Sequence, residues 1–177
     1  MSTFVRTFFD HSRHILLVND VAQLLDVLDF EGSEGLSEVF NYRIEFTCSD
    51  LDIAAQTLLG QQASFSLFGA PPTRGYPAFG LPETGPLRVL NGVVSGFKRL
   101  SGSRDEGRYQ ITLEPRLALL GRGRQFRIYQ YQTVPEIVES ILRSRHDFRG
   151  QDFFFNLVRE YPKRLQVMQY GESDLAF

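Results

Sequence analysis

Three histidines and one cysteine are the side chains of this sequence that could ligate a metal ion or act as a nucleophile and base. His11 and His14 are three residues apart, a spacing that suits a metal ion on a helix, but no cysteine or carboxylate pair stands at matching intervals. We expect both to be surface or capping residues. Cys48 and His146 could form a catalytic pair only by meeting in the folded chain, and neither has a local signature of such a site.

Each of these residues has a simpler structural interpretation. Cys48 follows a predicted strand and is expected to be a small apolar core residue, and a lone cysteine without a partner favours a reducing compartment. His146 is expected just beyond a helix end, where a positive charge complements the last carbonyls. The stretch Gly121–Arg124 lacks the strand–turn–helix setting of a phosphate-binding loop. We therefore predict no catalytic, cofactor-binding or metal site and no enzymatic activity.

The densest basic cluster combines four arginines with two aromatic residues: Arg116, Arg122, Arg124, Arg127, Phe126 and Tyr129. Basic and aromatic side chains together could bind single-stranded nucleic acid. They could also contact an acidic protein surface or form a solvated turn, and we favour the turn. The formal net charge of −2 argues against a nucleic-acid partner.

Charge is distributed unevenly along the chain. Residues 1–60 contain 3 basic and 10 acidic side chains, whereas residues 61–177 contain 16 basic and 11 acidic ones. This asymmetry indicates either acidic and basic strands that are neighbours within one fold, or an assembly unit with complementary faces. The first interpretation is favoured.

The elements that carry these residues are predicted to be mostly strands. Sixteen Phe, seven Tyr and no Trp suit a β-rich core. Tyr42, Ile44 and Phe46 alternate strictly with polar residues, which is typical of a half-buried antiparallel strand. A short helix is expected over 53–59, after Asp50 and Asp52. The predicted strands of this part are 15–18, 24–30 (with Leu25, Val27 and Leu28 in the core), 40–48, 63–67, 87–100 and 108–114.

Two segments leave alternatives open. Residues 69–86 contain four Gly and five Pro and predict a long loop, either a tolerated insertion or a partner-binding excursion. The dipeptide Asn91-Gly92 is a strong hairpin signal, so 87–100 is either broken by a tight turn or is one strand bulged at Gly92. The hairpin over 93–113 is expected in either case.

The last third of the sequence predicts a second folding unit. The composition changes at 121–124, which places a boundary between residues 1–122 and 123–177. Thr133 and Glu136 form a capping-box pattern at the start of a helix over 134–145, whose expected apolar face is Val134, Ile137, Val138, Ile141 and Leu142. Strands are predicted at 126–131, 153–158 and 165–170.

The sequence contains no run of 18 apolar residues, so no stable membrane anchor is expected. Met1–Asp10 lacks an apolar core and a cleavage site, so we expect no signal peptide.

Four segments, taken in order, resemble the N-terminal region of the VgrG spike proteins of type VI secretion systems: Gly35–Arg43, Arg108–Pro115, Arg127–Val138 and Glu160–Leu175. The resemblance runs from about residue 24 to the end. The sequence departs from the family pattern in the length of 69–86 and in the glycines of 121–124. The resemblance favours one continuous strand through Asn91-Gly92.

The resemblance implies a mainly β protein: a tail-tube-like antiparallel β-barrel (1–122) followed by the start of a second α+β hub domain (123–177). It implies a structural role in the puncturing device, coupling a trimeric spike to the hexameric tail tube. Expected partners are further copies of the chain in a homotrimer, the haemolysin-coregulated tube protein, baseplate proteins and effectors.

The same resemblance implies that the protein resides in the bacterial cytoplasm before firing and is then translocated into a target cell. It also implies that the sequence is an N-terminal piece, with apolar surface exposed in the second domain. The alternatives are the hub of a phage tail or phage-tail-like injector, which shares the fold, and a nucleic-acid-binding β-barrel.

Overall fold

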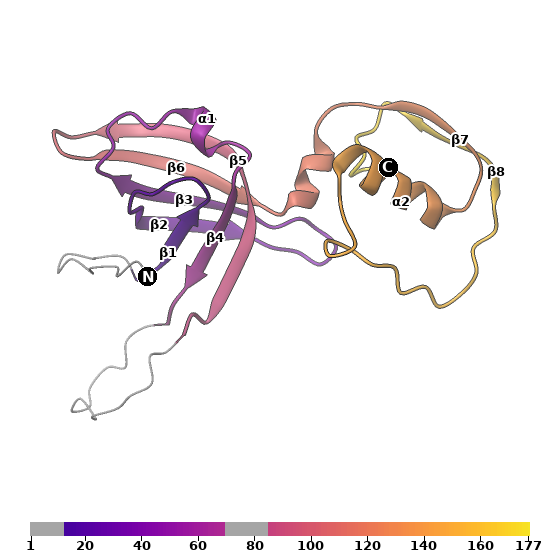
Figure 1. Cartoon of the computed structure of the whole chain (residues 1–177), viewed down its shortest axis with the longest axis horizontal. Coiled ribbons are helices and arrows are strands. Elements are labelled where there is room, and N and C mark those ends of the chain that lie inside the picture. Colours follow the sequence, from indigo (N-terminus) through magenta and orange to yellow (C-terminus); the bar gives the residue numbers. More distant parts are fainter. Residues whose placement is uncertain (1–12, 70–84) are drawn as a thin grey trace. The chain divides into compact units, whose positions relative to one another are not determined.

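The computed structural model describes residues 13–69 and 85–177 (Figure 1). It divides into two compact units, Met1–Arg116 and Leu117–Phe177. The division falls a few residues before the expected boundary at 122/123, because Leu120 belongs to the core of the second unit. The first unit contains β1 Ile15–Val18, β2 Asp26–Ser33, β3 Asn41–Cys48, α1 Ala55–Leu58, β4 Gln62–Leu67, β5 Arg88–Gly102 and β6 Gly107–Glu114.

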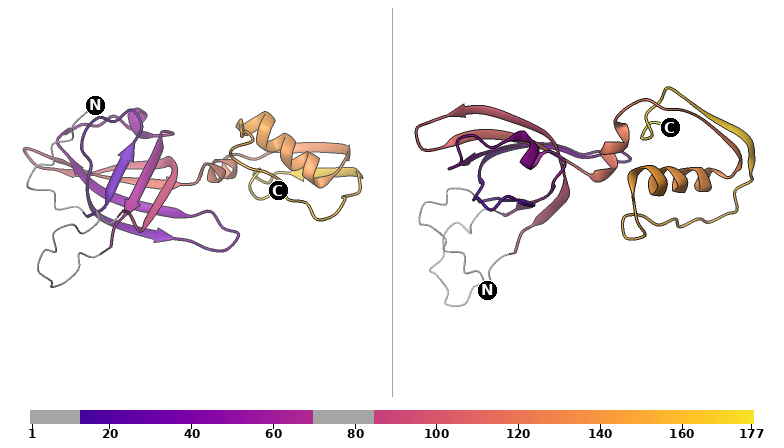
Figure 2. Two further views of the ribbon diagram at one scale, coloured as in Figure 1. Left: turned by 60° about the horizontal axis from the view of Figure 1, so that its bottom comes forward. Right: turned by 45° about the horizontal axis from the view of Figure 1, so that its top comes forward.

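The six strands of the first unit form a closed antiparallel barrel in the order β1-β2-β3-β6-β5-β4. Closure comes from β1, which pairs with β2 on one side and with β4 on the other. Figure 2 shows the strands curling round to meet. The predicted fold class, a mainly β protein built on an antiparallel barrel, is confirmed.

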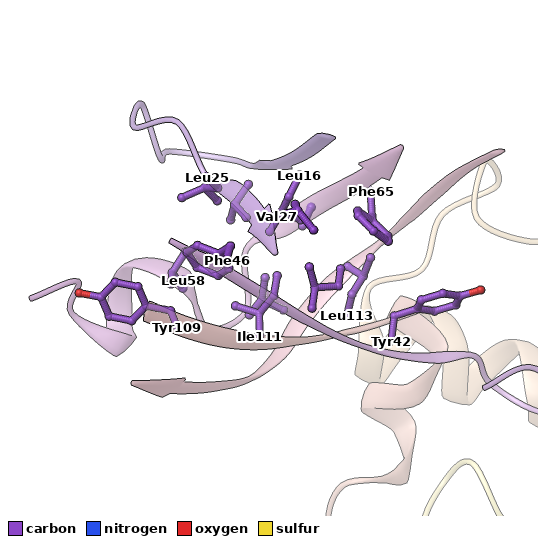
Figure 3. Packing of buried hydrophobic residues seen from close by; sticks show 14 of the residues in the cluster. Leu16, Leu25, Val27, Tyr42, Phe46, Leu58, Phe65, Tyr109, Ile111 and Leu113 are labelled. Atoms are coloured by element: carbon purple, nitrogen blue, oxygen red, sulfur yellow. The ribbon is translucent and has the colours of Figure 1, made fainter. Parts of the chain in front are cut away.

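The barrel core is built by inward rows of alternating side chains on β3 and β6 (Figure 3). The register aligns these rows, since Phe46 pairs with Tyr109 and Ile44 with Ile111. Burying each of these side chains contributes about 1.5–3 kcal/mol. The predicted core positions on the two strands are all buried: Tyr42, Ile44, Phe46, Tyr109, Ile111 and Leu113.

The predicted core position Leu28 is wrong, although Leu25 and Val27 are buried as expected. The side chain of Leu28 is 48% exposed. The reason is a β-bulge in β2, where the register with β3 shifts between Val27 and Asp29. The extra residue turns outward, and Phe30 returns to the barrel core.

The dipeptide Asn91-Gly92 does not form a hairpin, and β5 runs through it as one strand. No register shift occurs at Gly92 either, where the pairing with Ala63 of β4 is regular. The bulges of β5 lie later, between Val94 and Gly96 and between Arg99 and Ser101. The predicted hairpin over 93–113 is confirmed, whereas most of the predicted 69–86 loop lies outside the described residues.

Gly92 is present because two backbones approach closely. A Cβ at this position would lie 2.3 Å from the carbonyl oxygen of Glu114 on β6. Pairing on both edges of β5 therefore overrides the turn propensity of Asn91-Gly92. Glycine is required at position 92 because a larger residue would clash with the backbone of β6.

Helix α1 is shorter than the predicted 53–59. The Asp50 side chain accepts a hydrogen bond from the Asp52 N–H at 3.0 Å, which makes a local turn before the helix begins. Asp50 and Asp52 therefore precede the helix rather than forming its first turn. Leu58 is buried in the barrel core, so one side chain fixes the helix to the sheet.

The second unit contains most of the 3₁₀ helix η1 Arg116–Gly121, then β7 Phe126–Gln132, α2 Val134–His146 and β8 Arg164–Tyr170. The predicted capping box is confirmed: the Glu136 N–H donates to the Thr133 hydroxyl, and the Thr133 N–H donates to Glu136 Oε2 at 2.7 Å. Ile137, Ile141 and Leu142 of the predicted apolar face are buried, whereas Val134 and Val138 are partly exposed. Strands β7 and β8 pair antiparallel.

The predicted strand at Phe153–Val158 does not form. Phe153 instead packs against the cluster of Leu120, Leu142 and Phe148. A segment with strong β-propensity becomes a strand only when it pairs with a sheet edge, and Phe153–Val158 pairs with neither β7 nor β8.

Candidate functional site

The two side chains of the possible catalytic pair belong to different units. Cys48 lies in the barrel core with 2% exposure, and His146 belongs to the second unit. His14 Nδ1 accepts a hydrogen bond from the Phe68 N–H at 3.3 Å, and its ring stands edge-on to Phe30. Burial lowers the pKa of His14, and the nearby Arg13 charge lowers it further. His11 lies outside the described residues.

His146 is the last residue of α2 rather than lying beyond it, and it belongs to a polar cluster around Asp174. The Asp174 side chain is 2% exposed, accepts hydrogen bonds from Arg145 at 3.1 Å and Gln169 at 2.9 Å, and lies 2.8 Å from His146 Nε2. Burial favours the neutral acid, but the hydrogen bonds from Gln169 and His146 and the charge of Arg145 outweigh it. The pKa of Asp174 is therefore lowered. This cluster attaches the C-terminal turn to α2.

In the part of the chain that the structure describes, no three His, Cys, Asp or Glu side chains are grouped as a metal ion would require. Over the same ranges, 13–69 and 85–177, no helix has the length and apolar character needed to cross a bilayer.

One end of the barrel core is closed by Tyr42. Its hydroxyl donates to Glu34 Oε1 at 2.8 Å, and Arg88 pairs with the same carboxylate at 2.6 Å. The hydrogen bond from Tyr42 and the bond from Arg88 lower the pKa of Glu34. Burial and the bond to Glu34 raise the pKa of Tyr42. At this end of the barrel, the Glu34–Arg88 ion pair is therefore joined to Tyr42 by a hydrogen bond from the tyrosine hydroxyl.

The opposite end is closed by Tyr109, and Figure 3 shows the hydroxyls of Tyr42 and Tyr109 pointing away from each other. The Tyr109 hydroxyl donates to the Asp50 carbonyl at 2.8 Å and accepts from the Ile53 N–H at 3.3 Å. Beside it, Arg99 pairs with Asp52 at 3.0 Å. Each end of the barrel therefore carries an arginine that a partner could contact.

Ion pairs across the barrel explain the uneven charge of the sequence. Acidic residues from the first sixty positions pair with arginines from later ones, in the pairs Glu34–Arg88, Glu45–Arg108 and Asp52–Arg99. One of these pairs, Glu45–Arg108, joins the neighbouring strands β3 and β6, as the favoured interpretation of the charge asymmetry expects, whereas Glu34 and Asp52 lie between elements. These exposed pairs contribute little stability each, about 0–1 kcal/mol.

The predicted arginine cluster is divided between the two units, since Arg116 ends the first unit and the other three arginines lie in the second. Arg124 and Arg127 are exposed. Whether they contact nucleic acid, protein or solvent stays a prediction. Asp174 is a site residue that no local pattern predicted, although it falls in the Glu160–Leu175 segment that carries the family resemblance.

The fold and the side chains together define the class of protein, which is a closed antiparallel β-barrel. In the described residues, the clusters of ionisable side chains form hydrogen bonds and ion pairs that join neighbouring elements of the fold. Comparison with known families specifies it further. The chain belongs to the phage tail baseplate hub (GPD) family, whose profile matches residues 33–177.

Similar proteins include type VI secretion system spike proteins. VgrG4b and VgrG5 of Pseudomonas aeruginosa are 32% and 34% identical over 86% and 92% of this chain. VgrG3 of Vibrio cholerae is 27% identical over 86%. The chain spans only 17%, 18% and 14% of the lengths of these relatives.

Among solved structures, an Escherichia coli component of the type VI secretion system is similar, with a TM-score of 0.77 and 54% identity over 90% of this chain and 40% of that one. That protein is described as structurally similar to the T4 bacteriophage tail proteins gp27 and gp5. The resemblance to VgrG spike proteins seen in the sequence is confirmed.

Proposed function

We propose that this chain is the N-terminal hub region of a type VI secretion spike and that its barrel couples the spike to the tail tube. Three copies of the barrel form a pseudo-sixfold ring that stacks on a hexameric ring of the haemolysin-coregulated tube protein. The observation that carries the proposal is the closed barrel together with its 54% identity to a type VI secretion component.

The role is mechanical. A part that transmits force between spike and tube needs a stiff wall, and the aligned apolar rows of β3 and β6 supply one. The proposed domains are a tail-tube-like barrel over 1–122 and the beginning of a second hub domain over 123–177. The proposal places the protein in the bacterial cytoplasm before firing and in the target cell afterwards, with baseplate proteins and effectors as further partners.

The test is binding of the full chain to purified tube protein, measured by co-sedimentation at two salt concentrations. Arg88→Glu and Arg99→Glu probe the Tyr42 end and the Tyr109 end separately. Because a barrel stacks through one end, one substitution should abolish binding and the other should leave it nearly unchanged. The affinity should also fall as salt rises. No binding by the unaltered chain, or equal insensitivity of both ends, would refute the coupling role.

A second candidate is the hub of a phage tail or phage-tail-like injector, because the family that matches residues 33–177 is itself described as a phage tail hub. A tube protein from a phage tail, tested in the same assay, separates the two. Preferential binding to the phage tube protein would favour this second candidate.

A further inference from the structure

The two ends of the barrel differ in how the chain is connected there. Neighbouring strands run in opposite directions, so β1 and β5 begin, and β4 and β6 end, on the side of Tyr42. Arg88 at the start of β5 is joined to Tyr42 through Glu34. The second unit follows β6 directly, so its chain leaves the barrel at the Tyr42 end. The connection from β4 to β5 joins the barrel at the same end.

The opposite end, on the side of Tyr109, is built from three connections that return at once to the barrel. They are residues 19–25 between β1 and β2, residues 49–61 between β3 and β4, and residues 103–106 between β5 and β6. Backbone hydrogen bonds attach the first two to the strands, from Asn19 to Gln62 at 2.9 Å and from Gly60 to Val94 at 2.8 Å. A surface fixed in this way loses little conformational entropy when a partner binds.

The connection 49–61 is also held from inside the barrel. The buried Tyr109 hydroxyl bonds to backbone groups on both sides of Asp52. Leu58 of α1 is buried in the barrel core. Asp52 is thereby kept at the surface, where it pairs with Arg99.

The surface of the Tyr109 end combines apolar and charged side chains. Its exposed leucines are Leu24, Leu51, Leu59 and Leu100. Together with the Asp52–Arg99 pair, they offer the mixture of apolar contacts and polar rim that specific interfaces use. Leu36 and Leu87 are exposed at the Tyr42 end, so apolar character alone does not distinguish the two ends. Chain connectivity does.

We propose that the barrel meets the tube ring with its Tyr109 end. The inference rests on the proposed coupling role and names the surface that performs it. A barrel that stacks through one end keeps the other for the rest of its own chain, and connectivity gives that second role to the Tyr42 end. The partner surface that fits carries apolar side chains between charges of both signs. Such a surface can bury the leucines and form new ion pairs with Asp52 and Arg99.

Paired lysine substitutions in the full chain test this assignment. Leu24→Lys combined with Leu59→Lys, at the Tyr109 end, should weaken binding to purified tube protein about tenfold or more in co-sedimentation. The matched control at the Tyr42 end, Leu36→Lys combined with Leu87→Lys, should change the affinity by less than about twofold. All four side chains are exposed and none belongs to the barrel core, so both variants should fold.

Protection of introduced cysteines provides a second measurement. Gln56→Cys at the Tyr109 end and Ser33→Cys at the Tyr42 end are both at exposed positions, and Cys48 is buried. With saturating tube protein, maleimide labelling of the Gln56→Cys chain should slow about fivefold or more, whereas labelling of the Ser33→Cys chain should stay within about twofold.

The outcomes separate this inference from the proposed function. Weakened binding and protection confined to the Tyr42 end, or shared equally by both ends, would overturn the inference and leave the coupling role intact. Binding that neither pair of substitutions weakens would also overturn it. A chain that does not bind tube protein at all overturns both the inference and the coupling role.

Discussion

Replacing Gly92 by alanine tests whether the barrel wall is as tightly built as the register indicates. The added Cβ would lie 2.3 Å from the Glu114 carbonyl oxygen and 3.0 Å from its carbonyl carbon. Carbon–oxygen contacts ordinarily reach about 3.3 Å, so β5 and β6 must separate locally by about 1 Å. The neighbouring pairing of Val93 with Glu114 would then exceed hydrogen-bond range.

The magnitude follows from three contributions. Overpacking costs about 1–3 kcal/mol, and a lost ladder bond costs about 1 kcal/mol. Alanine reduces the entropy of the unfolded chain and returns about 0.5–1 kcal/mol. We therefore expect Gly92→Ala to lower the free energy of unfolding by about 1–3.5 kcal/mol and the Tm by about 2–14 °C.

Urea unfolding followed by tyrosine fluorescence measures this change, since the chain contains no Trp and Tyr109 is fully buried. The matched control is Gly150→Ala, because no atom lies within 4 Å of a Cβ built at Gly150. If the two variants differ by less than about 0.5 kcal/mol, the close approach of the two strands does not explain the glycine.

Three further substitutions probe other contacts. Tyr109→Phe should destabilise the barrel by about 1–2 kcal/mol in urea unfolding, because the Asp50 carbonyl loses its buried donor. Asp174→Asn should destabilise the second unit by about 2–3 kcal/mol, because Arg145 loses a buried counter-charge. Since the fold lowers the Asp174 pKa, that stabilisation is fully present above the unfolded pKa of about 3.9 and is lost as pH falls through the lower pKa of the folded state, so acid titrations of both proteins should converge only below that folded-state pKa. Thr133→Ala should cost about 1 kcal/mol by circular dichroism melting, through loss of the helix cap.

Local patterns predicted much of the fold. The two-residue period of 42–46 and 109–113 identified the strands and their buried faces, because alternation leaves a half-buried strand only one way to face the core. The capping box at Thr133 fixed the start of α2, since its hydrogen bonds involve residues three positions apart. Family motifs gave the class of protein. The site residues could be placed less well, because the ion pairs at the barrel ends join residues far apart in the chain.

Only the tertiary structure decided the features that depend on a neighbouring strand. The bulge that turns Leu28 outward and the straight passage of β5 through Gly92 are set by pairing with β3, β4 and β6. Phe153–Val158 shows the same dependence in reverse, because a β-prone sequence that pairs with no neighbouring strand stays irregular. Sequence determines which residues can pair and which face is apolar. Which strands pair is decided in the folded chain, because every residue except proline offers the same backbone N–H and C=O groups for pairing.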